Sequence, residues 1–263
     1  QILTFQNKQY ILADGFLYII QGDKILSKIF LRKDALTFHL DGDFLYLGLF
    51  AGLETYKMNG NQLQFINLFP LTAGVSKILK FNNQIIFTTY GGGFFVKNGN
   101  SVTKYQNKPF DNIENFFKIK QGFGLVSYES GLSILDEKLN FISHINKKNG
   151  LHSNFVTTVF ADTDTVYIGA KKGIAQWYNN KIVKTFKAEE GFSGNLTRLI
   201  FRDVKNRIWV LTDKDLLLKT KNILKPIGSI RILDNKEDLI LKGDYSASDH
   251  KLTVVSKNKI SII

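Results

Sequence analysis

A short pattern recurs six times along the chain at nearly constant spacing. It consists of an apolar segment, a small residue, a short turn, a closing residue and a second apolar segment. The closing residues are Gly15, Gly52, Gly93, Gly131, Gly173 and Asp215. Successive closing residues are 37 to 42 positions apart. A step near 40 residues that carries about four short strands is typical of β-propeller blades.

The segments between the turns have the periodicity of strands. They are short, rich in β-branched and aromatic residues, and bounded by Asn, Asp, Gly and Lys. No apolar pattern with helical spacing persists over three turns. The clearest repeat unit predicts strands at 155–160, 165–170, 173–178 and 181–186. Gly173 closes the central hairpin of this unit, where a positive φ favours glycine.

We therefore predict an all-β chain that forms a β-propeller with seven blades of four antiparallel strands. Residues 1–228 are expected to hold six blades. Their approximate limits are 3–35, 36–77, 78–115, 116–154, 155–195 and 196–228. Residues 229–263 contain four further apolar segments, the first at 230–233, and are expected to form the seventh blade. Closing such a ring removes the exposed strand edges that promote aggregation.

Composition excludes several classes of site. The 263 residues include no Cys, and the 4 His lie far apart, so we expect no disulfide, no metal site and no cofactor. The net charge is +12, but 30 of the 35 basic residues are scattered Lys, which argues against a nucleic-acid interface. No apolar run approaches the roughly 20 residues that a membrane crossing needs. The chain opens with Gln1 instead of a leader, which predicts a mature or excised domain.

One part of the chain resembles a known family. The segments 150–162, 166–174, 191–203 and 207–210 are similar to the two-component regulator propeller repeat. In this comparison His152 stands for the usual Pro, Tyr167 for Trp and Ala170 for Thr. The resemblance implies a propeller from the extracytoplasmic sensor region of a hybrid two-component system or a related regulator, mostly found in Bacteroidota. Because of these three departures, the resemblance does not imply a ligand site typical of that family.

A second resemblance concerns the C-terminal stretch. Residues 229–263 are also similar to the start of the Ig-like triple-tyrosine domain that often follows such propellers. This alternative stands beside the seventh blade.

Counting strand directions places the candidate ligand site. In a four-stranded blade, the turn between the second and third strands lies at the same end as the link to the next blade. Aromatic rings, carboxylates, an amide and cations would gather at that mouth and could hold a sugar or a small molecule. The candidates are Tyr90, Tyr128, Glu129, His152, Asn154, Lys171, Lys172 and Asp213. The alternative for each is a structural role, since such residues also satisfy turn geometry.

These observations predict a periplasmic or extracytoplasmic, non-catalytic propeller that senses a glycan or another small ligand. Its signal would pass through neighbouring domains of a longer chain, in a possible homodimer, to a kinase or DNA-binding output. The alternative is a cell-surface or secretion-associated scaffold that binds protein or lipopolysaccharide. Enzyme activity is disfavoured because few titratable groups can gather. Gly91 to Gly93 is not a phosphate-binding loop, since neither a Lys-Ser or Lys-Thr pair nor a helix follows.

Overall fold

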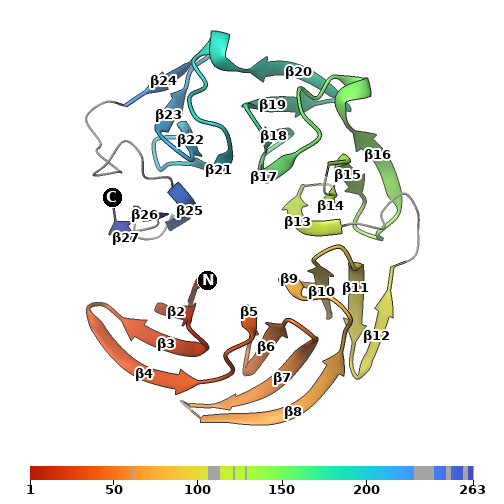
Figure 1. Cartoon of the computed structure of the whole chain (residues 1–263), viewed down its shortest axis with the longest axis vertical. Helices are drawn as coiled ribbons and strands as arrows, with labels where there is room; N and C mark the ends of the chain where they lie inside the picture. The colour runs from red at the N-terminus through yellow and green to blue at the C-terminus, as the bar shows by residue number, and fades with distance from the viewer. Residues whose placement is uncertain are drawn as a thin grey trace. The chain divides into compact units, whose positions relative to one another are not determined.

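The computed structural model describes residues 1–60, 62–105, 113–120, 122–127, 129–227, 240–246, 250–256 and 260–262. These residues form six four-stranded sheets and one three-stranded sheet, all antiparallel, and two short 3-10 helices (Figure 1). The chain divides into two compact units, residues 1–116 (unit 1) and 117–263 (unit 2). The predicted all-β class is confirmed.

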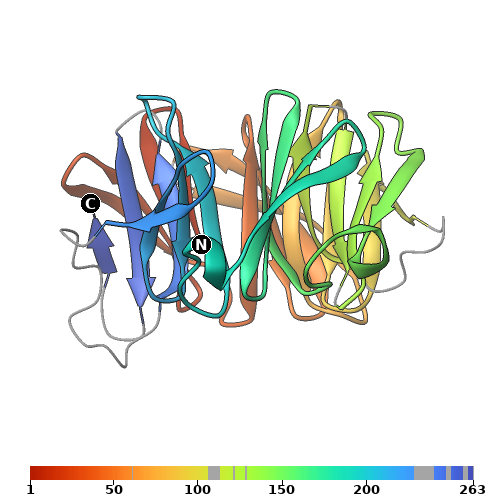
Figure 2. The same cartoon turned by 90° about the horizontal axis from the view of Figure 1, so that it is seen from above.

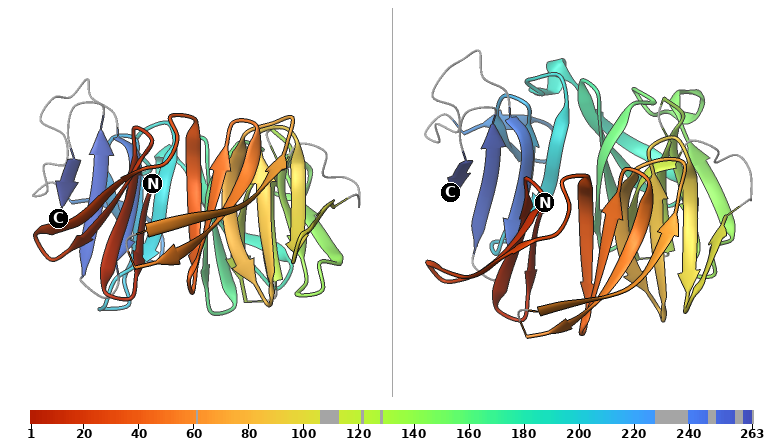
Figure 3. Two further views of the ribbon diagram at one scale, coloured as in Figure 1. Left: turned by 90° about the horizontal axis from the view of Figure 1, so that it is seen from below. Right: turned by 60° about the horizontal axis from the view of Figure 1, so that its bottom comes forward.

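Unit 1 contains three complete sheets, each made of strands that follow one another in the chain. The first sheet consists of β1 (Ile2–Phe5), β2 (Lys8–Ala13), β3 (Phe16–Gln21) and β4 (Lys24–Phe30). The second consists of β5 (Ala35–Asp41), β6 (Phe44–Leu49), β7 (Gly52–Asn59) and β8 (Gln62–Pro70). The third consists of β9 (Val75–Phe81), β10 (Gln84–Thr89), β11 (Gly93–Asn98) and β12 (Ser101–Lys104). Their alternating strand directions are visible in Figure 3, from red to yellow.

Unit 2 contains the remaining sheets, and the first strand of the fourth sheet crosses the division between the units. The fourth sheet consists of β13 (Ile113–Ile119), β14 (Gly122–Ser127), β15 (Gly131–Leu135) and β16 (Phe141–Ile145). The fifth consists of β17 (Val156–Asp162), β18 (Thr165–Ala170), β19 (Gly173–Tyr178) and β20 (Lys181–Phe186). The sixth consists of β21 (Thr197–Arg202), β22 (Ile208–Thr212), β23 (Leu216–Lys219) and β24 (Leu224–Pro226). Figure 2 shows these strands, coloured green to blue, along their length.

The last sheet of unit 2 has three described strands. They are β25 (Ile240–Ser246), β26 (Lys251–Ser256) and β27 (Ile260–Ile262). The apolar segment expected at 230–233 lies outside the described residues. The 3-10 helices η1 (Lys147–Asn149) and η2 (Ala188–Glu190) lie in the links that enter the fifth and sixth sheets.

The strands predicted for the clearest repeat unit match the structure closely. The strands β18, β19 and β20 begin and end where the sequence pattern places them, and β17 is shifted by one or two residues. Second strands such as β14 and β22 are buried along their whole length, which explains their continuous apolar sequence. Fourth strands such as β4 are largely exposed, so apolar and polar residues alternate less strictly along them.

Glycine recurs at the position that closes the central hairpin for a second physical reason, besides the backbone conformation required there. A Cβ built on Gly173 would lie 2.6 Å from the carbonyl oxygen of Phe186, at the end of the fourth strand of the same sheet. At Gly15 the corresponding distance to the Arg32 oxygen is 2.6 Å, and Gly15 has a φ of 80°. The third strand therefore begins where the chain after the fourth strand passes too close for any side chain.

Hydrophobic clusters lie between consecutive sheets. In unit 1, Leu17 and Ile19 of β3 pack with Phe38 of β5 and Leu47 of β6. In unit 2, Trp177 of β19 belongs to the cluster between the fourth and fifth sheets, and Trp209 of β22 belongs to the cluster between the sixth sheet and the last. Both tryptophans are buried. They serve as packing between sheets, as large aromatic side chains commonly do.

The sequence step of about 40 residues reappears as polar contacts between adjacent sheets. The Lys80 ammonium lies 2.7 Å from Asp41, 39 residues earlier. Arg202 pairs with Asp162, 40 residues earlier. The hydroxyl of Thr157 donates to the carbonyl of Thr197, 40 residues later, at 2.6 Å. Equivalent or immediately adjacent positions of neighbouring repeats thus contact one another within each unit.

Candidate functional site

The hairpin tip between β18 and β19 carries two of the predicted site residues. The main-chain nitrogen of Lys171 donates to the Phe155 oxygen at 3.0 Å, and that of Lys172 donates to the Asn195 oxygen at 2.8 Å. Lys172 adopts a left-handed φ of 62°. Both lysine side chains are exposed. The tip therefore lies beside the link that enters the next sheet, and its two cations are free to meet a ligand.

Asp213 lies at the corresponding tip between β22 and β23, but its carboxylate is engaged in the fold. Oδ1 accepts hydrogen bonds from the main-chain nitrogens of Asn195 at 2.7 Å and Leu196 at 3.2 Å. The carbonyl oxygen of Asp213 accepts from the nitrogen of Ile240 at 2.9 Å, which joins the tip to β25. The residue is 4% exposed. These contacts give Asp213 a structural role.

His152 packs against the start of β19. A Cβ on Gly173 would lie 2.9 Å from its Nε2, and among the described residues neither ring nitrogen has a hydrogen-bond partner of normal geometry. Burial lowers the pKa of His152, and the nearby charge of Lys187 lowers it further. The imidazole is therefore neutral at pH 7 and acts first as a packing group.

The remaining predicted residues of this group differ in their availability. The Asn154 amide oxygen accepts from the Lys147 nitrogen at 2.8 Å, so it stabilises the turn around η1. Glu129 lies exposed at the tip between β14 and β15, with a left-handed φ of 55°. Tyr128 lies outside the described residues. The structure thus brings His152, Lys171, Lys172 and Asp213 to one end of the fifth and sixth sheets.

Tyr90 belongs to unit 1, at the tip between β10 and β11. It is 58% exposed, and its nitrogen donates to the Gly74 oxygen at 2.8 Å. Phe50, at the tip between β6 and β7, is 63% exposed. A Cβ on Gly74 would lie 3.5 Å from the Phe50 Cα and 3.5 Å from Cδ2 of Tyr90. The glycine therefore separates two exposed aromatic residues on adjacent hairpin tips.

Sequence reasoning missed Phe50, although a signal was present. Phe50 and Tyr90 both directly follow the second strand of their sheets, as Lys171 and Asp213 do. Their main-chain nitrogens donate to the segment that precedes the first strand: Phe50 to Asp34 at 3.3 Å and Tyr90 to Gly74 at 2.8 Å. Reading this one position across the repeats would have found the aromatic pair.

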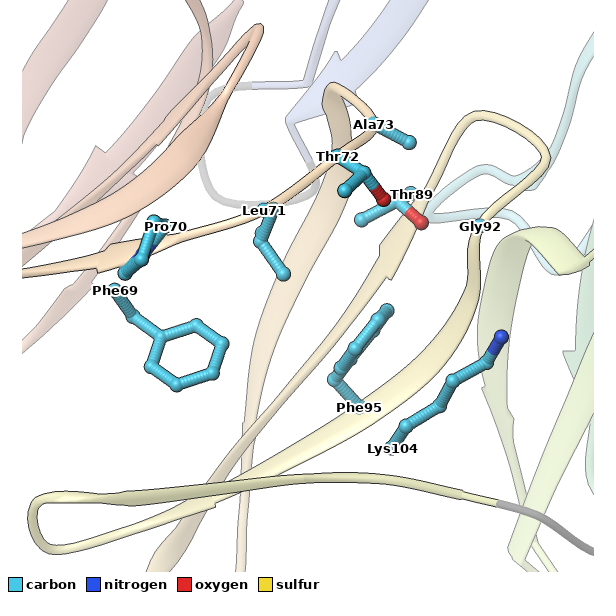
Figure 4. A pocket seen from close by; sticks show the side chains of 9 residues that line it. All are labelled: Phe69, Pro70, Leu71, Thr72, Ala73, Thr89, Gly92, Phe95 and Lys104. Carbon is cyan, nitrogen blue, oxygen red and sulfur yellow. The ribbon is translucent and has the colours of Figure 1, made fainter.

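Unit 1 also contains a pocket of about 400 Å³ that the sequence did not predict (Figure 4). Its lining residues are Phe69, Pro70, Leu71, Thr72, Ala73, Thr89, Gly92, Phe95 and Lys104. Most of the wall is apolar. Thr89 is fully buried, and its hydroxyl has no hydrogen-bond partner in the part of the chain that the structure describes. The predicted site residues do not line this pocket, although Tyr90 directly follows Thr89.

Two absences concern the described part of the chain. Among those residues, no three His, Cys, Asp or Glu side chains form a group that could hold a metal ion. No helix described there has the length and apolar character that a membrane crossing requires.

Solved structures identify the fold. The extracellular domain of BT3049, assigned to a hybrid two-component system of B. thetaiotaomicron, is similar with a TM-score of 0.78 and 17% identity, over 99% of this chain and 38% of that chain. The extracellular domain of BT4673 from the same organism, assigned to a one-component system, has a TM-score of 0.75 and 16% identity, over 100% and 38%. The WD40 β-propeller domain of Doa1 has a TM-score of 0.71 and 13% identity, over 99% and 90%. The chain has the β-propeller fold.

The propeller spans 38% of each of the two B. thetaiotaomicron chains. The sequence matches no protein-family model and no curated protein. The resemblance to the two-component regulator propeller repeat agrees with these two structural neighbours. At these identities the likeness shows the fold alone, because one fold can carry many functions.

Proposed function

We propose that this propeller is an extracytoplasmic, non-catalytic sensor module that binds a glycan or another small ligand at its hairpin tips. Two observations support the proposal. The similar extracellular domains of BT3049 and BT4673 are assigned to signalling systems. The tips of unit 1 present Phe50 and Tyr90 as exposed aromatic residues on either side of Gly74. The aromatic pair is the observation that carries the binding proposal.

Phe50 and Tyr90 are the two most exposed aromatic side chains among the described residues. Both rings lose contact with water when a flat apolar surface covers them, and burial of such rings is strongly favourable. The Tyr90 hydroxyl adds a donor and acceptor at the edge of the surface. A sugar has the matching combination of apolar ring faces and hydroxyl groups.

Among the predicted site residues of unit 2, Glu129, Lys171 and Lys172 have exposed side chains that remain available for a ligand. His152, Asn154 and Asp213 would support them indirectly, because their polar groups are buried or already bonded within the fold. We propose no catalytic role for any of these residues.

We further propose that residues 229–263 continue the repeat series as a seventh unit, with six units in 1–228. The packing of β25 supports this. The rings of Phe201 and Tyr245 stack with centroids 4.4 Å apart, and Ile240 belongs to the cluster that contains Trp209. A contact of this kind between consecutive sheets is what a further repeat would make. Neighbouring domains of a longer chain would then receive the signal.

The binding proposal is tested by thermal unfolding of the full chain with a panel of neutral oligosaccharides. A ligand that binds only the folded state raises the melting temperature by mass action. We expect at least one member to do so, and Phe50→Ala and Tyr90→Ala to abolish the shift. Tyr178→Ala is the control, since Tyr178 is 40% exposed at the end of β19 that lies opposite the tip between β18 and β19. No shift across the panel, or a shift that survives both tip substitutions, contradicts the proposal.

A further inference from the structure

Two lysines of unit 2, one on the fifth sheet and one on the sixth, approach the same aromatic ring. Lys184 lies on β20 and Lys219 on β23. The Lys219 ammonium lies 5.3 Å from the ring centroid of Phe186 and 5.4 Å from that of Tyr167. The Lys184 ammonium lies 5.3 Å from the same Phe186 ring. Side chains from two sheets thus bring two cations to one aromatic residue.

Neither lysine has an ion-pair partner among the described residues. Lys184 donates to the Asn222 amide oxygen at 3.1 Å, and Lys219 makes a long contact of 3.4 Å with the Thr220 carbonyl. The carboxylate whose charge acts on Lys219 is that of Asp162, which is paired with Arg202. Three cations and one carboxylate leave this cluster with a net charge of +2 (3 − 1).

The positive charges of Lys184 and Lys219 repel each other. Burial lowers the pKa of Lys219, and the charge of Lys184 lowers it further, although Asp162 acts in the opposite direction. Both side chains are partly exposed, so a ligand from solvent can reach them. A bound anion would remove the repulsion and replace the water that the two ammonium groups have lost.

The two corresponding positions in unit 1 carry one lysine instead of two. Lys97 occupies the position of Lys219, since each is the fourth residue after the one that closes the central hairpin, Gly93 or Asp215. Its ammonium lies 5.7 Å from the ring of Tyr46 on the preceding sheet and donates to the Gly99 carbonyl. The strand register places Asn67 where Lys184 lies, two residues before Phe69 and Phe186 respectively.

Of the two lysines in unit 2, Lys219 has a counterpart in unit 1 and Lys184 has none at the corresponding position. A third-strand lysine over an aromatic ring occurs in both units and belongs to the packing between sheets. At the two corresponding strand positions of unit 1, Lys97 is a cation and Asn67 is not, and the Lys97 ammonium is bonded to the main chain. A further lysine, Lys104, lines the pocket that contains Phe69 and comes from a different strand, β12. The second cation, Lys184, is the feature that the packing does not require.

We propose that Lys184 and Lys219 form an anion-binding site that takes a carboxylate, sulfate or phosphate group of a ligand. Each ammonium supplies donors to an anionic oxygen, Lys184 from the fifth sheet and Lys219 from the sixth. Asn222 lies beside Lys184 and adds an amide donor. This site is independent of the aromatic tips Phe50 and Tyr90, which lie in unit 1.

The test is titration of the full chain with inorganic sulfate, inorganic phosphate and glucuronate, each at constant ionic strength set with chloride. The probes separate an inorganic anion from a carboxylated sugar. Binding is followed by nuclear magnetic resonance of the ¹⁵N-labelled lysine ammonium groups. We expect saturable shifts of the Lys184 and Lys219 signals for at least one probe.

Lys184→Asn is the central variant, because it copies the residue that unit 1 carries at this place. We expect it to weaken the apparent Kd by about tenfold, since a charge-assisted hydrogen bond contributes on the order of 1.5 kcal/mol. Lys97→Gln is the matched control, since it removes one charge at the position equivalent to Lys219, and we expect unchanged binding. Melting curves of each variant verify folding.

Three outcomes overturn the proposal: no saturable shift with any probe, equal binding by Lys184→Asn and the original chain, or equal loss with Lys97→Gln. The last outcome would show that the anions respond to net charge and not to this pair. Failure of this site leaves the test of Phe50 and Tyr90 unaffected, because the oligosaccharides used there are neutral.

Discussion

The carboxylate of Asp203 accepts a hydrogen bond from the indole nitrogen of Trp209, 2.8 Å away. The same carboxylate accepts from the main-chain nitrogens of Lys205 and Arg207 and from the Arg207 guanidinium. The guanidinium carbon lies 5.1 Å from the Trp209 ring. Asp203 thus closes the turn between β21 and β22 and orients the tryptophan that packs toward the last sheet.

Substitution of Asp203 is expected to destabilise unit 2. Asp203→Ala leaves the Trp209 nitrogen and two main-chain nitrogens without their acceptor, at a cost on the order of 2 kcal/mol. Asp203→Asn keeps an acceptor but loses the charge, so it should cost less. Urea denaturation at neutral pH measures both. Equal stability of Asp203→Ala and the original chain would contradict this role.

The same carboxylate predicts a loss of stability in strong acid. Burial alone would raise the pKa of Asp203, but hydrogen bonds from Trp209 and Arg207 lower it to about 2. The usual Asp value is near 3.9. A lowered pKa stabilises the folded chain above about pH 4, and this contribution disappears as pH falls toward 2. Compared with Asp203→Asn, the original chain should lose more stability between these pH values, which unfolding curves at each pH measure.

His152 predicts a second pH dependence, in a milder range. Burial lowers its pKa, so between the unfolded value near 6.5 and its folded value the unfolded chain binds more protons. The contribution of neutral His152 to the stability of the fold is therefore fully present above about pH 6.5 and is lost as the pH decreases below that value. His39, whose pKa burial also lowers, contributes in the same direction. His152→Gln should show a smaller loss between pH 7 and pH 5, and an identical pH profile would refute the assignment.

The close approach at the repeated glycine predicts a large cost for the smallest side chain. Gly15→Ala would force a Cβ to 2.6 Å from the Arg32 oxygen in a residue with a φ of 80°. Gly99 is the control, because it has a φ of 55° and no atom within 4 Å of its Cβ position. Gly99→Ala should cost about 1 kcal/mol for the backbone conformation alone. Gly15→Ala should cost clearly more by chemical denaturation, and equal costs would exclude the steric contribution.

Much of the fold followed from local sequence. The regular spacing of the hairpin glycines and the short apolar segments predicted β18, β19 and β20 with their correct ends. This was possible because the two-residue periodicity of a strand and the residue preferences of a turn are local properties. Tip positions for Tyr90, Lys171 and Asp213 followed from counting strand directions. Their environments did not follow. Asp213 is buried and bonded to a neighbouring link, whereas Lys171 at the equivalent position is exposed.

By itself, the sequence determined that the chain is all-β, repeats every 40 residues or so and turns at Gly15, Gly52, Gly93, Gly131 and Gly173. Only the tertiary structure decided which side chains meet. The placement of Phe50 and Tyr90 beside Gly74, and of Lys184 and Lys219 at the Phe186 ring, brings together residues about 35 to 40 positions apart through the packing of adjacent sheets. Burial and charge at such contacts depend on both sheets at once, and no single segment of the chain contains that information.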